Sequence, residues 1–564
     1  MPPATAPRWR HLVRWGLPAA LVLAALVYHA AQRRGTVLEA ALRDWAINEV
    51  SGATDSVYQL SVGGLRLSVF PGRITFDSMR LSTDTMRNDF RADPYPVLTA
   101  TAAGCRLMGI DTWRLMMARG VSARLFRCDE IKATVFEVVR DRPPVQPAVA
   151  NPRGGVPFVR DSIELPALLP TIILRKTELP RVSLDYRRRV RGGAETRVHL
   201  ERLNVQLRGT RIDPSVPPEA RRPLFSDQAV VTADTLKVVE GTDRAVMLGR
   251  LRANLTDSTL ALDSIIMGPP QSDAEWVKAQ QKRTDLIRLQ LDSARFHGVD
   301  YRRLGSIEGA MVVRRAMLHG FKLDVLSDKR LPAGPARTRR TPQQWVASLE
   351  RPLAVDTVIF VGGRIGYSEH AVGRSQPGTM SWEKIAAQVT DIRTVPRVGE
   401  TTPPMVVQAS ALVLGQGKLE TTIEIPLTAA RFDMNYSGTL GPMDITAFNA
   451  YTARVMPMRL AGGTLQAVRV RVVVQNGRSV GQVVPLYQDF KVALEDKKAG
   501  FFKKAGLSVA SFFANAFKVR GENPGKAGEE PRIGRINYPY RPTASLPQVF
   551  WYALRQGMVE VFVK

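Results

Sequence analysis

The segment from Leu419 to Ile425 reads LETTIEI, and the segment from Val468 to Val474 reads VRVRVVV. Apolar residues alternate with polar or charged residues through most of both. Successive side chains of a β-strand point to opposite faces of the sheet, so a period of two predicts strands with one apolar and one solvated face. How often this pattern recurs decides the fold of the whole chain.

The pattern recurs through most of the sequence. Leu65 to Phe76 has it on both sides of Pro71-Gly72, which predicts a β-hairpin. Further strands are predicted at 97–107, 121–139, 182–186, 198–207, 229–239 and 246–267, and repeatedly between 353 and 494. Short helices are predicted at 36–50, 111–117, 273–282 and 342–349. We therefore expect a mostly β protein: an elongated, curled antiparallel sheet of repeated strand units with short interspersed helices.

One stretch near the N-terminus has a different character. Leu12 to Gln32 reads LVRWGLPAALVLAALVYHAAQ and reaches the roughly 20 residues that a helix needs to cross a bilayer. The flanking arginines favour a cytoplasmic N-terminus for residues 1–11. A cleaved signal peptide is the alternative, but Tyr28, His29 and Gln32 interrupt the small residues that cleavage requires. We expect a single-pass transmembrane anchor in an inner membrane, with the bulk of the chain in the periplasm.

Composition limits the partners. The chain has 564 residues, 45% of them hydrophobic, and a formal net charge of +27. This composition is ordinary for a chain that folds. In an exported protein, diffuse positive charge favours contact with anionic surfaces rather than nucleic acid; an arginine-rich proteome together with solubility is the alternative explanation of the charge. Cys105 and Cys128 either form a disulfide or are two buried small side chains; two thiols do not make a disulfide scaffold.

Two polar interruptions divide the chain. Asp141 to Pro157 is rich in proline, and Lys329 to Arg340 is basic. We expect an N-terminal helix with a β-region at 36–141, a middle β-repeat region at 158–342, a C-terminal β-region at 343–494 and a helical tail at 495–564. The tail holds two apolar patterns of helical spacing, at 499–519 and 546–556.

A short pattern, apolar-Asp-[Ser/Thr], recurs along the chain. Its aspartates are Asp77, Asp234, Asp263, Asp292 and Asp356, and the middle three are each 29 residues apart. A fixed period of strand-rich units is typical of stacked-strand arrays. Chance recurrence of a common strand-start pattern is the alternative.

Catalytic motifs are weak. Gly477 to Gly481 matches G-x-S-x-G around Ser479, but Asn476-Gly477 between two strands predicts a hairpin turn rather than a nucleophile elbow. Gly521 to Lys526 lacks the spacing and the Ser/Thr of a phosphate loop. The six histidines form no metal-binding spacing. We therefore predict no enzyme, no cofactor and no metal.

A sheet with one continuous apolar face has to cover it. Long amphipathic helices are scarce between residues 50 and 494, so the face either curls on itself, packs as an ordinary sandwich core, or holds an apolar ligand. Candidate groove residues are Leu65, Leu67, Val69, Ile423, Ile425, Met434, Val468, Val470 and Val472. Candidate contacts with a membrane or partner are Phe501, Phe502, Phe512, Phe513, Phe517 and Trp551.

Three stretches, in this order, resemble one family. They are the anchor followed by LSVGGLRLSVFPGRITFDSMRLS (60–82) and residues 109–141; IEIPLTAARFDMNYSGTLGPMDITAFNAYTARVMPMRLAGGTLQAVRVRVVV (423–474); and GQVVPLYQDFKVALEDK running into ASFFANAFKVRGENP (481–524). The order is similar to that of bacterial AsmA-like proteins, relatives of TamB and of the bridge-like lipid-transfer proteins. Residues 143–342 match only in their strand character.

The resemblance implies a periplasmic β-groove in a Gram-negative envelope, and phospholipid transfer between the inner and outer membranes that maintains the outer membrane. It brings no catalytic residues. An envelope scaffold that assists outer-membrane protein assembly without carrying lipid is the alternative function. The sequence leaves open the lipid species, the direction of transport, the energy source, the oligomeric state and the strand face that lines the groove.

Overall fold

The computed structural model describes residues 39–40, 43–44, 46–48, 50–52, 56–68, 72–84, 96–117, 119–139, 170–190, 194–217, 220–241, 244–304, 310–335, 338–349, 351–394, 402–494, 519–526 and 528–562. Strands account for 59% of the structure and helices for 14%, so the prediction of a mostly β protein is confirmed. The chain divides into two compact units: unit 1 is 1–236 with 254–256, and unit 2 is 237–253 with 257–564.

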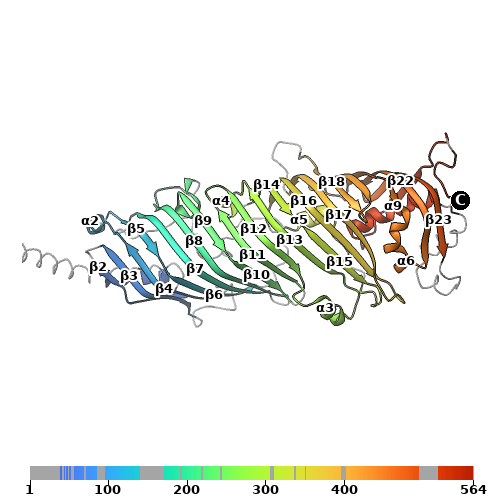
Figure 1. Ribbon diagram of the computed structural model, residues 1–564. Coiled ribbons are helices and arrows are strands. Elements are labelled where there is room, and N and C mark those ends of the chain that lie inside the picture. The colour runs from blue at the N-terminus through green and yellow to red at the C-terminus, as the bar shows by residue number, and fades with distance from the viewer. Residues whose placement is uncertain are drawn as a thin grey trace, which may run out of the picture. The chain divides into compact units, whose positions relative to one another are not determined.

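Unit 1 is built almost entirely of strands, which lie side by side in Figure 1. They are β1 (Tyr58–Gly63), β2 (Arg66–Ser68), β3 (Arg73–Thr83), β4 (Val97–Met108), β5 (Val121–Arg127), β6 (Glu130–Val139), β7 (Ile172–Val190), β8 (Glu195–Ile212), β9 (Gln228–Ala233) and the start of β10 (Thr235–Glu240). A short helix, α2 (Thr112–Met116), and a 3₁₀ turn, η2 (Pro223–Phe225), connect strands. Every described position between 39 and 52 is also helical.

Unit 2 continues with strands and adds more helices (Figure 1). Its strands are β11 (Arg244–Asn254), β12 (Thr259–Gly268), β13 (Leu286–His297), β14 (Met311–His319), β15 (Lys322–Asp328), β16 (Leu353–His370), β17 (Gly378–Arg393), β18 (Met405–Val413), β19 (Gly417–Ile425), β20 (Met434–Leu440), β21 (Met443–Asp444), β22 (Met458–Gln475), β23 (Arg478–Leu494) and β24 (Gly534–Pro539). Its helices are α3 (Asp273–Ala279), α4 (Tyr301–Leu304), α5 (Pro342–Ala347), η3 (Ile445–Ala450), α6 (Thr452–Val455) and α9 (Leu546–Phe562).

The predicted helices at 111–117, 273–282, 342–349 and 546–556 are confirmed as α2, α3, α5 and α9. α3 and α5 each begin at a capping box, Ser272 with Glu275 and Thr341 with Gln344, which satisfies the free N–H groups of the first turn. The predicted anchor at 12–32 and the predicted helix at 499–519 lie outside the described residues, apart from Val519. No helix in the described ranges is both long and apolar enough to span a membrane.

The sheet pairing is mixed, which corrects the expectation of an antiparallel sheet. β5 and β6 both pair with β7 in parallel, and β14 and β15 both pair with β16 in parallel. Parallel neighbours need a long connection that returns the chain to the starting end. The two long connections are 140–171 and 329–352, and they contain the proline-rich and basic interruptions seen in the sequence.

Several long strands are interrupted near their middle. β1 and β2 both pair with β3. In the same way, β5 and β6 both pair with β7, and β14 and β15 both pair with β16. The predictions of continuous strands at 121–139 and 229–239 were therefore wrong, because Cys128-Asp129 and Asp234 break them. The prediction of one strand at 246–267 was also wrong, because a turn at 255–258 separates β11 from β12.

Glycine and aspartate make the interruptions possible. Gly64 and Gly320 follow β1 and β14 with φ of 63° and 65°, a left-handed conformation that disfavours other residues. A Cβ atom at Gly64 would overlap the carboxylate of Asp77 on the adjoining strand, and one at Gly320 would overlap that of Asp292. These positions need glycine both for the backbone angle and for the close approach.

The recurring aspartates lie at or beside irregular strand pairing, but their 29-residue spacing is not a structural period. The interval between Asp234 and Asp263 contains the whole of β10 and β11, whereas α3 is the one named element that lies wholly between Asp263 and Asp292. Several of these carboxylates bind an arginine on a neighbouring strand: Asp77 with Arg66 (2.8 Å), Asp263 with Arg295 (2.5 Å) and Asp356 with Arg393 (2.6 Å). The pattern therefore marks strand irregularities rather than a repeated unit.

Side chains from helices occupy the open backbone positions of two outermost strands. Within the described chain, β2 pairs only with β3 and β24 only with β23. The N–H of Leu67 on β2 donates to the Glu39 carboxylate. On β24, the N–H of Arg535 donates to Glu560 of α9 (2.7 Å), and the N–H of Asn537 donates to Gln556 (2.9 Å). Edge strands with free N–H groups are templates for further strand pairing, and these contacts occupy them.

We expect Gly320→Ala to lower the unfolding temperature of the chain more than Gly373→Ala does. Both glycines have a left-handed φ, of 65° and 76°, which costs an alanine about 1–3 kcal/mol. Only Gly320 faces a neighbouring carboxylate; nothing lies within 4 Å of a Cβ at Gly373. Thermal unfolding followed by circular dichroism measures both, and equal shifts would contradict the close packing described at Gly320.

Candidate functional site

Two apolar rows cross unit 2 on one face of its sheet. Each row joins residues that are direct register partners on β12, β13, β14, β16, β17, β18, β19, β20 and β22. Row A is Leu262, Ala294, Leu318, Phe360, Ala387, Ala409, Thr421, Gly438 and Val470; row B is Leu260, Phe296, Ala316, Val358, Val389, Val407, Ile423, Tyr436 and Val472. Members of the two rows are two residues apart on each strand, so both rows share a face.

The row between them faces the other way and is largely polar. Towards the C-terminal end it runs through Gln388, Gln408, Thr422, Ser437 and Arg471. Gln388, Gln408 and Arg471 are exposed, whereas Ala387, Ala409 and Val470 of row A are half-buried. The sheet of unit 2 therefore has one apolar and one solvated face along this stretch.

Unit 1 contains the same arrangement on fewer strands. One apolar row is Leu60, Leu81, Ala100, Ala133, Leu184 and Leu200, and the next is Val62, Met79, Ala102, Ile131, Val182 and Leu203. Each set crosses β1, β3, β4, β6, β7 and β8. Register, and not only composition, therefore aligns apolar side chains in both units.

Helix α9 covers the apolar face of unit 2 at its C-terminal end. Val549 and Ala553 of α9 are buried against Met434, Val472 and Val483 in the largest core cluster. Tyr436 contributes to the same cluster, with its ring edge-on to Phe550 at a centroid distance of 4.7 Å. A second cluster continues through Val561 of α9 to Tyr487 and Phe490.

The middle of row A lies outside these helix-covered clusters. Phe360, Ala387, Ala409 and Thr421 are half-buried and belong to neither cluster that contains α9. At the other end of row B, Tyr301 of α4 packs among Leu260, Phe296 and Val358 and donates its hydroxyl to the carbonyl of Thr259. We call the stretch of row A from Phe360 to Thr421 the central apolar stretch.

The sequence-predicted groove residues are distributed over these regions. Ile423, Val470 and Val472 lie on the two rows, and Ile425, Met434 and Val468 complete the cluster under α9. In unit 1, Leu67 is buried beside Ile74, Val121 and Ala123, and Leu65 is half-buried. Val69, Phe501, Phe502, Phe512, Phe513 and Phe517 lie outside the described residues; Trp551 lies on α9 with 51% of its surface exposed.

Sequence reasoning missed Ala387, Ala409 and Gly438 of row A. Small residues at alternate positions do not look like a binding surface until their register partners are known. Their only sequence signal is that β17 and β18 carry alanine in the row where β16 carries Phe360 and β22 carries Val470. Because their side chains are small, Ala387 and Ala409 add less side-chain volume to row A than Phe360 does.

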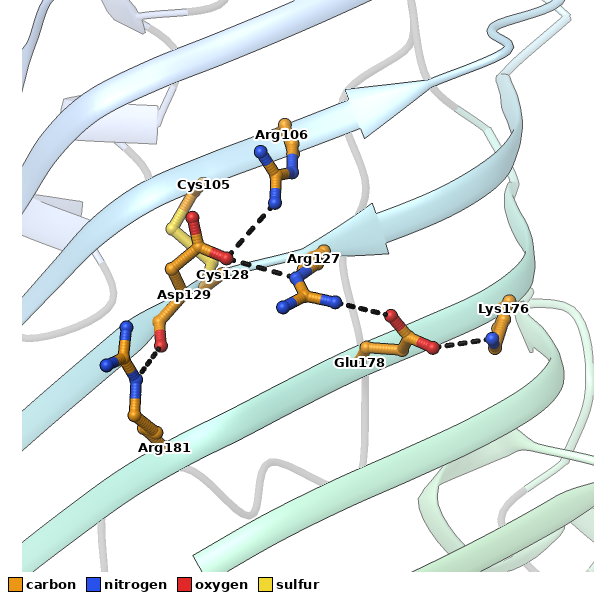
Figure 2. Close-up of polar contacts among 8 residues, drawn as sticks. All are labelled: Cys105, Arg106, Arg127, Cys128, Asp129, Lys176, Glu178 and Arg181. Carbon is orange, nitrogen blue, oxygen red and sulfur yellow. Dashed lines mark hydrogen bonds and ion pairs between the residues drawn. A yellow bond between two sulfur atoms is a disulfide. The ribbon is translucent and has the colours of Figure 1, made fainter. Parts of the chain in front are cut away.

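The polar face of unit 1 carries an ion-pair network beside a disulfide, shown in Figure 2. Cys105 of β4 is bonded to Cys128, which lies at the interruption between β5 and β6, and both are 2% exposed. Of the two alternatives for these cysteines, the structure contains the disulfide. It joins β4 to the interrupted strand at the point where regular pairing is lost.

Charged groups bridge the same strands (Figure 2). Asp129 accepts from Arg106 (3.2 Å) and Arg127 (3.0 Å), and Arg127 also binds Glu178 of β7 (3.1 Å). The hydrogen bond from Arg127 lowers the pKa of Asp129, and that from Lys176 lowers the pKa of Glu178. The network fits a structural role, because each carboxylate is already paired with cations on neighbouring strands.

The remaining chemistry of the described residues is sparse. They contain no group of three or more His, Cys, Asp or Glu side chains placed to hold a metal ion. Ser479 lies on β23, is 1% exposed, and follows a turn that joins β22 to β23. The strand–turn–strand geometry confirms the hairpin prediction at Asn476-Gly477 and differs from the strand–turn–helix of a nucleophile elbow.

The chain matches no model of a known protein family, and no curated protein is significantly similar to it.

We expect Ala553→Asp to destabilise unit 2 strongly. Ala553 lies on the sheet-facing side of α9 and is fully buried. An unpaired carboxylate at this position costs about 3 kcal/mol or more. Trp551→Asp, on the exposed side of the same helix, is the matched control and should change stability little. Thermal unfolding would reveal a similar loss in both variants if α9 were not packed as described.

We expect the pKa of His199 in unit 1 to lie above the ordinary value of about 6.5. Its ring nitrogens lie 2.6 Å from Asp185 and 2.8 Å from Glu201, and the hydrogen bond with Asp185, then that with Glu201, raises the pKa. A raised histidine pKa stabilises the fold below the unfolded-state pKa, and this contribution is lost as pH rises through the folded-state value. NMR titration of the His199 ring measures its pKa. Asp185→Asn should lower that pKa, and an unchanged pKa would refute the pairing of His199 with Asp185.

Proposed function

We propose that this protein is anchored in an inner membrane and handles phospholipid on the apolar face of its periplasmic sheet. The observation that carries the proposal is the pair of apolar rows across nine strands of unit 2, with a central stretch outside the clusters that α9 covers. A wholly structural core would be covered along its length.

The dimensions suit acyl chains. Neighbouring strands are about 4.8 Å apart, so the eight intervals from β12 to β22 extend for roughly 38 Å. Acyl chains lying along the rows would replace water on half-buried Phe360, Ala387 and Ala409, and about 25 cal/mol is gained for each Å² of apolar surface removed from water. Head groups would remain in solvent at the margin of the rows.

Two further features support the proposed compartment. Disulfides persist in oxidising compartments such as the periplasm, which supports export of the chain. The apolar stretch at 12–32, which only the sequence describes, supports an anchor. Lipid transfer towards an outer membrane is the role that we propose for such a tethered surface, with phospholipid as its partner and no catalytic step.

The test is to purify the full chain gently from membranes, extract it, and quantify phospholipid per chain by mass spectrometry. We expect bound phospholipid in the wild-type protein and loss of most of it in Ala409→Trp, because the indole would fill the central apolar stretch. Gln408→Trp is the matched control, since the adjacent side chain points to the solvated face.

Each outcome separates the two functions. A folded wild-type chain without phospholipid would overturn lipid handling and favour an envelope scaffold, which should instead retain protein partners. Equal lipid loss in both variants, with unchanged unfolding temperatures, would show that the lipid does not occupy the apolar rows.

A further inference from the structure

A hollow of about 970 Å³ lies on the solvated face of unit 2 and crosses β16, β17, β18, β19, β20, β22 and β23. Phe360, Ala387, Ala409 and Thr421 of the central apolar stretch border the hollow, together with the residues on either side of each. The next residues of the apolar face, such as Val389, Val407 and Ile423, do not, so the side chains that enclose the hollow are those that flank row A and point to the solvated face. Gln482 and Val484 of β23 line it, whereas Val483, which is fully buried in the cluster under α9, does not. The hollow is therefore on the opposite side of the sheet from the α9 cluster. A twisted sheet is saddle-shaped, so each face is concave along one direction.

A straight row of polar side chains runs along this hollow. Gln408, Thr422, Ser437, Arg471 and Gln482 are successive register partners on β18, β19, β20, β22 and β23. From β18 to β23 the groups are an amide, two hydroxyls, a guanidinium and a second amide, across roughly 19 Å of sheet, or four strand intervals of about 4.8 Å each. Such a row presents both donors and acceptors to a linear ligand that lies across the strands.

Positive charge is available in the same place. Arg469 and Arg471 line the hollow, are exposed, and make no ion pair with any residue that the structure describes. The acidic side chain in the lining, Glu420, is paired with Lys418 at 2.5 Å. The two arginines are two residues apart on β22 and therefore point to the same side.

We propose that this hollow binds a segment of acidic polysaccharide. Guanidinium groups bind carboxylate or phosphate substituents through paired N–H donors, and glutamine and threonine side chains hydrogen-bond to sugar hydroxyls. The hollow is shallow and extends across seven strands, which fits a polymer chain better than a compact metabolite. The polar side chains of the site point away from the apolar rows, so polysaccharide binding does not depend on lipid binding to those rows.

The test measures binding of the full chain to polygalacturonate by calorimetry in buffers of increasing salt. We expect Arg469→Ala with Arg471→Ala to weaken binding about tenfold or more, the effect of losing one or two charge-assisted hydrogen bonds. Arg459→Ala with Lys491→Ala removes the same charge from exposed positions on β22 and β23 outside the hollow, and should weaken it much less.

A second pair of measurements distinguishes the polysaccharide from other anions. Gln408→Ala with Gln482→Ala leaves the charge unchanged and should weaken polygalacturonate binding but not polyphosphate binding. Neutral dextran should not bind. Equal weakening by both double charge variants, no effect of the glutamine variant, or preference for phosphatidylglycerol vesicles over polygalacturonate would each overturn the proposal.

Discussion

Backbone hydrogen bonding between neighbouring strands is the constraint on which the other features depend. It fixes which residue lies beside which, and one step of register would exchange the two faces of a strand. Across β12 to β22 the register holds Phe360 beside Ala387 and Ala387 beside Ala409. The same ladder places Gln388 beside Gln408 on the opposite face. Both proposed binding surfaces result from one set of backbone contacts.

The strand interruptions allow long strands to keep this register. A one-residue irregularity changes the local direction of the chain and normally reverses which side chains face inward. In β13, buried Leu291 and buried Ala294 belong to the same cluster although they are three residues apart, with Asp292 at the irregularity between them. The apolar face thus continues past the interruption. Gly320, which packs against Asp292, provides the space for this on the next strand.

Local pattern predicted the strands well, and non-local contacts account for what it missed. Alternation at Leu419–Ile425 and Val468–Val474 identified β19 and β22, and glycine and proline identified the turn before β3. The break at Cys128-Asp129 escaped notice because a two-residue interruption leaves the apolar composition almost unchanged. Parallel pairing of β6 with β7 joins segments across a 32-residue connection (140–171), which no local pattern reports.

The candidate site was only partly predictable for the same reason. Ile423, Val470 and Val472 were found because they are large and alternate with charge. Ala409 and Gly438 could be found only through their register partners. The sequence also could not show that Met434 and Val472 lie under α9, because that packing joins β20 and β22 to a helix more than seventy residues away.

The contacts from Glu39, Gln556 and Glu560 to the outermost strands have a consequence for self-association. The N–H groups of Leu67, Arg535 and Asn537 are already bonded, so β2 and β24 offer little template for pairing with a strand of another copy of the chain. In a protein rich in long, apolar-faced strands, these contacts disfavour association between copies through β2 and β24.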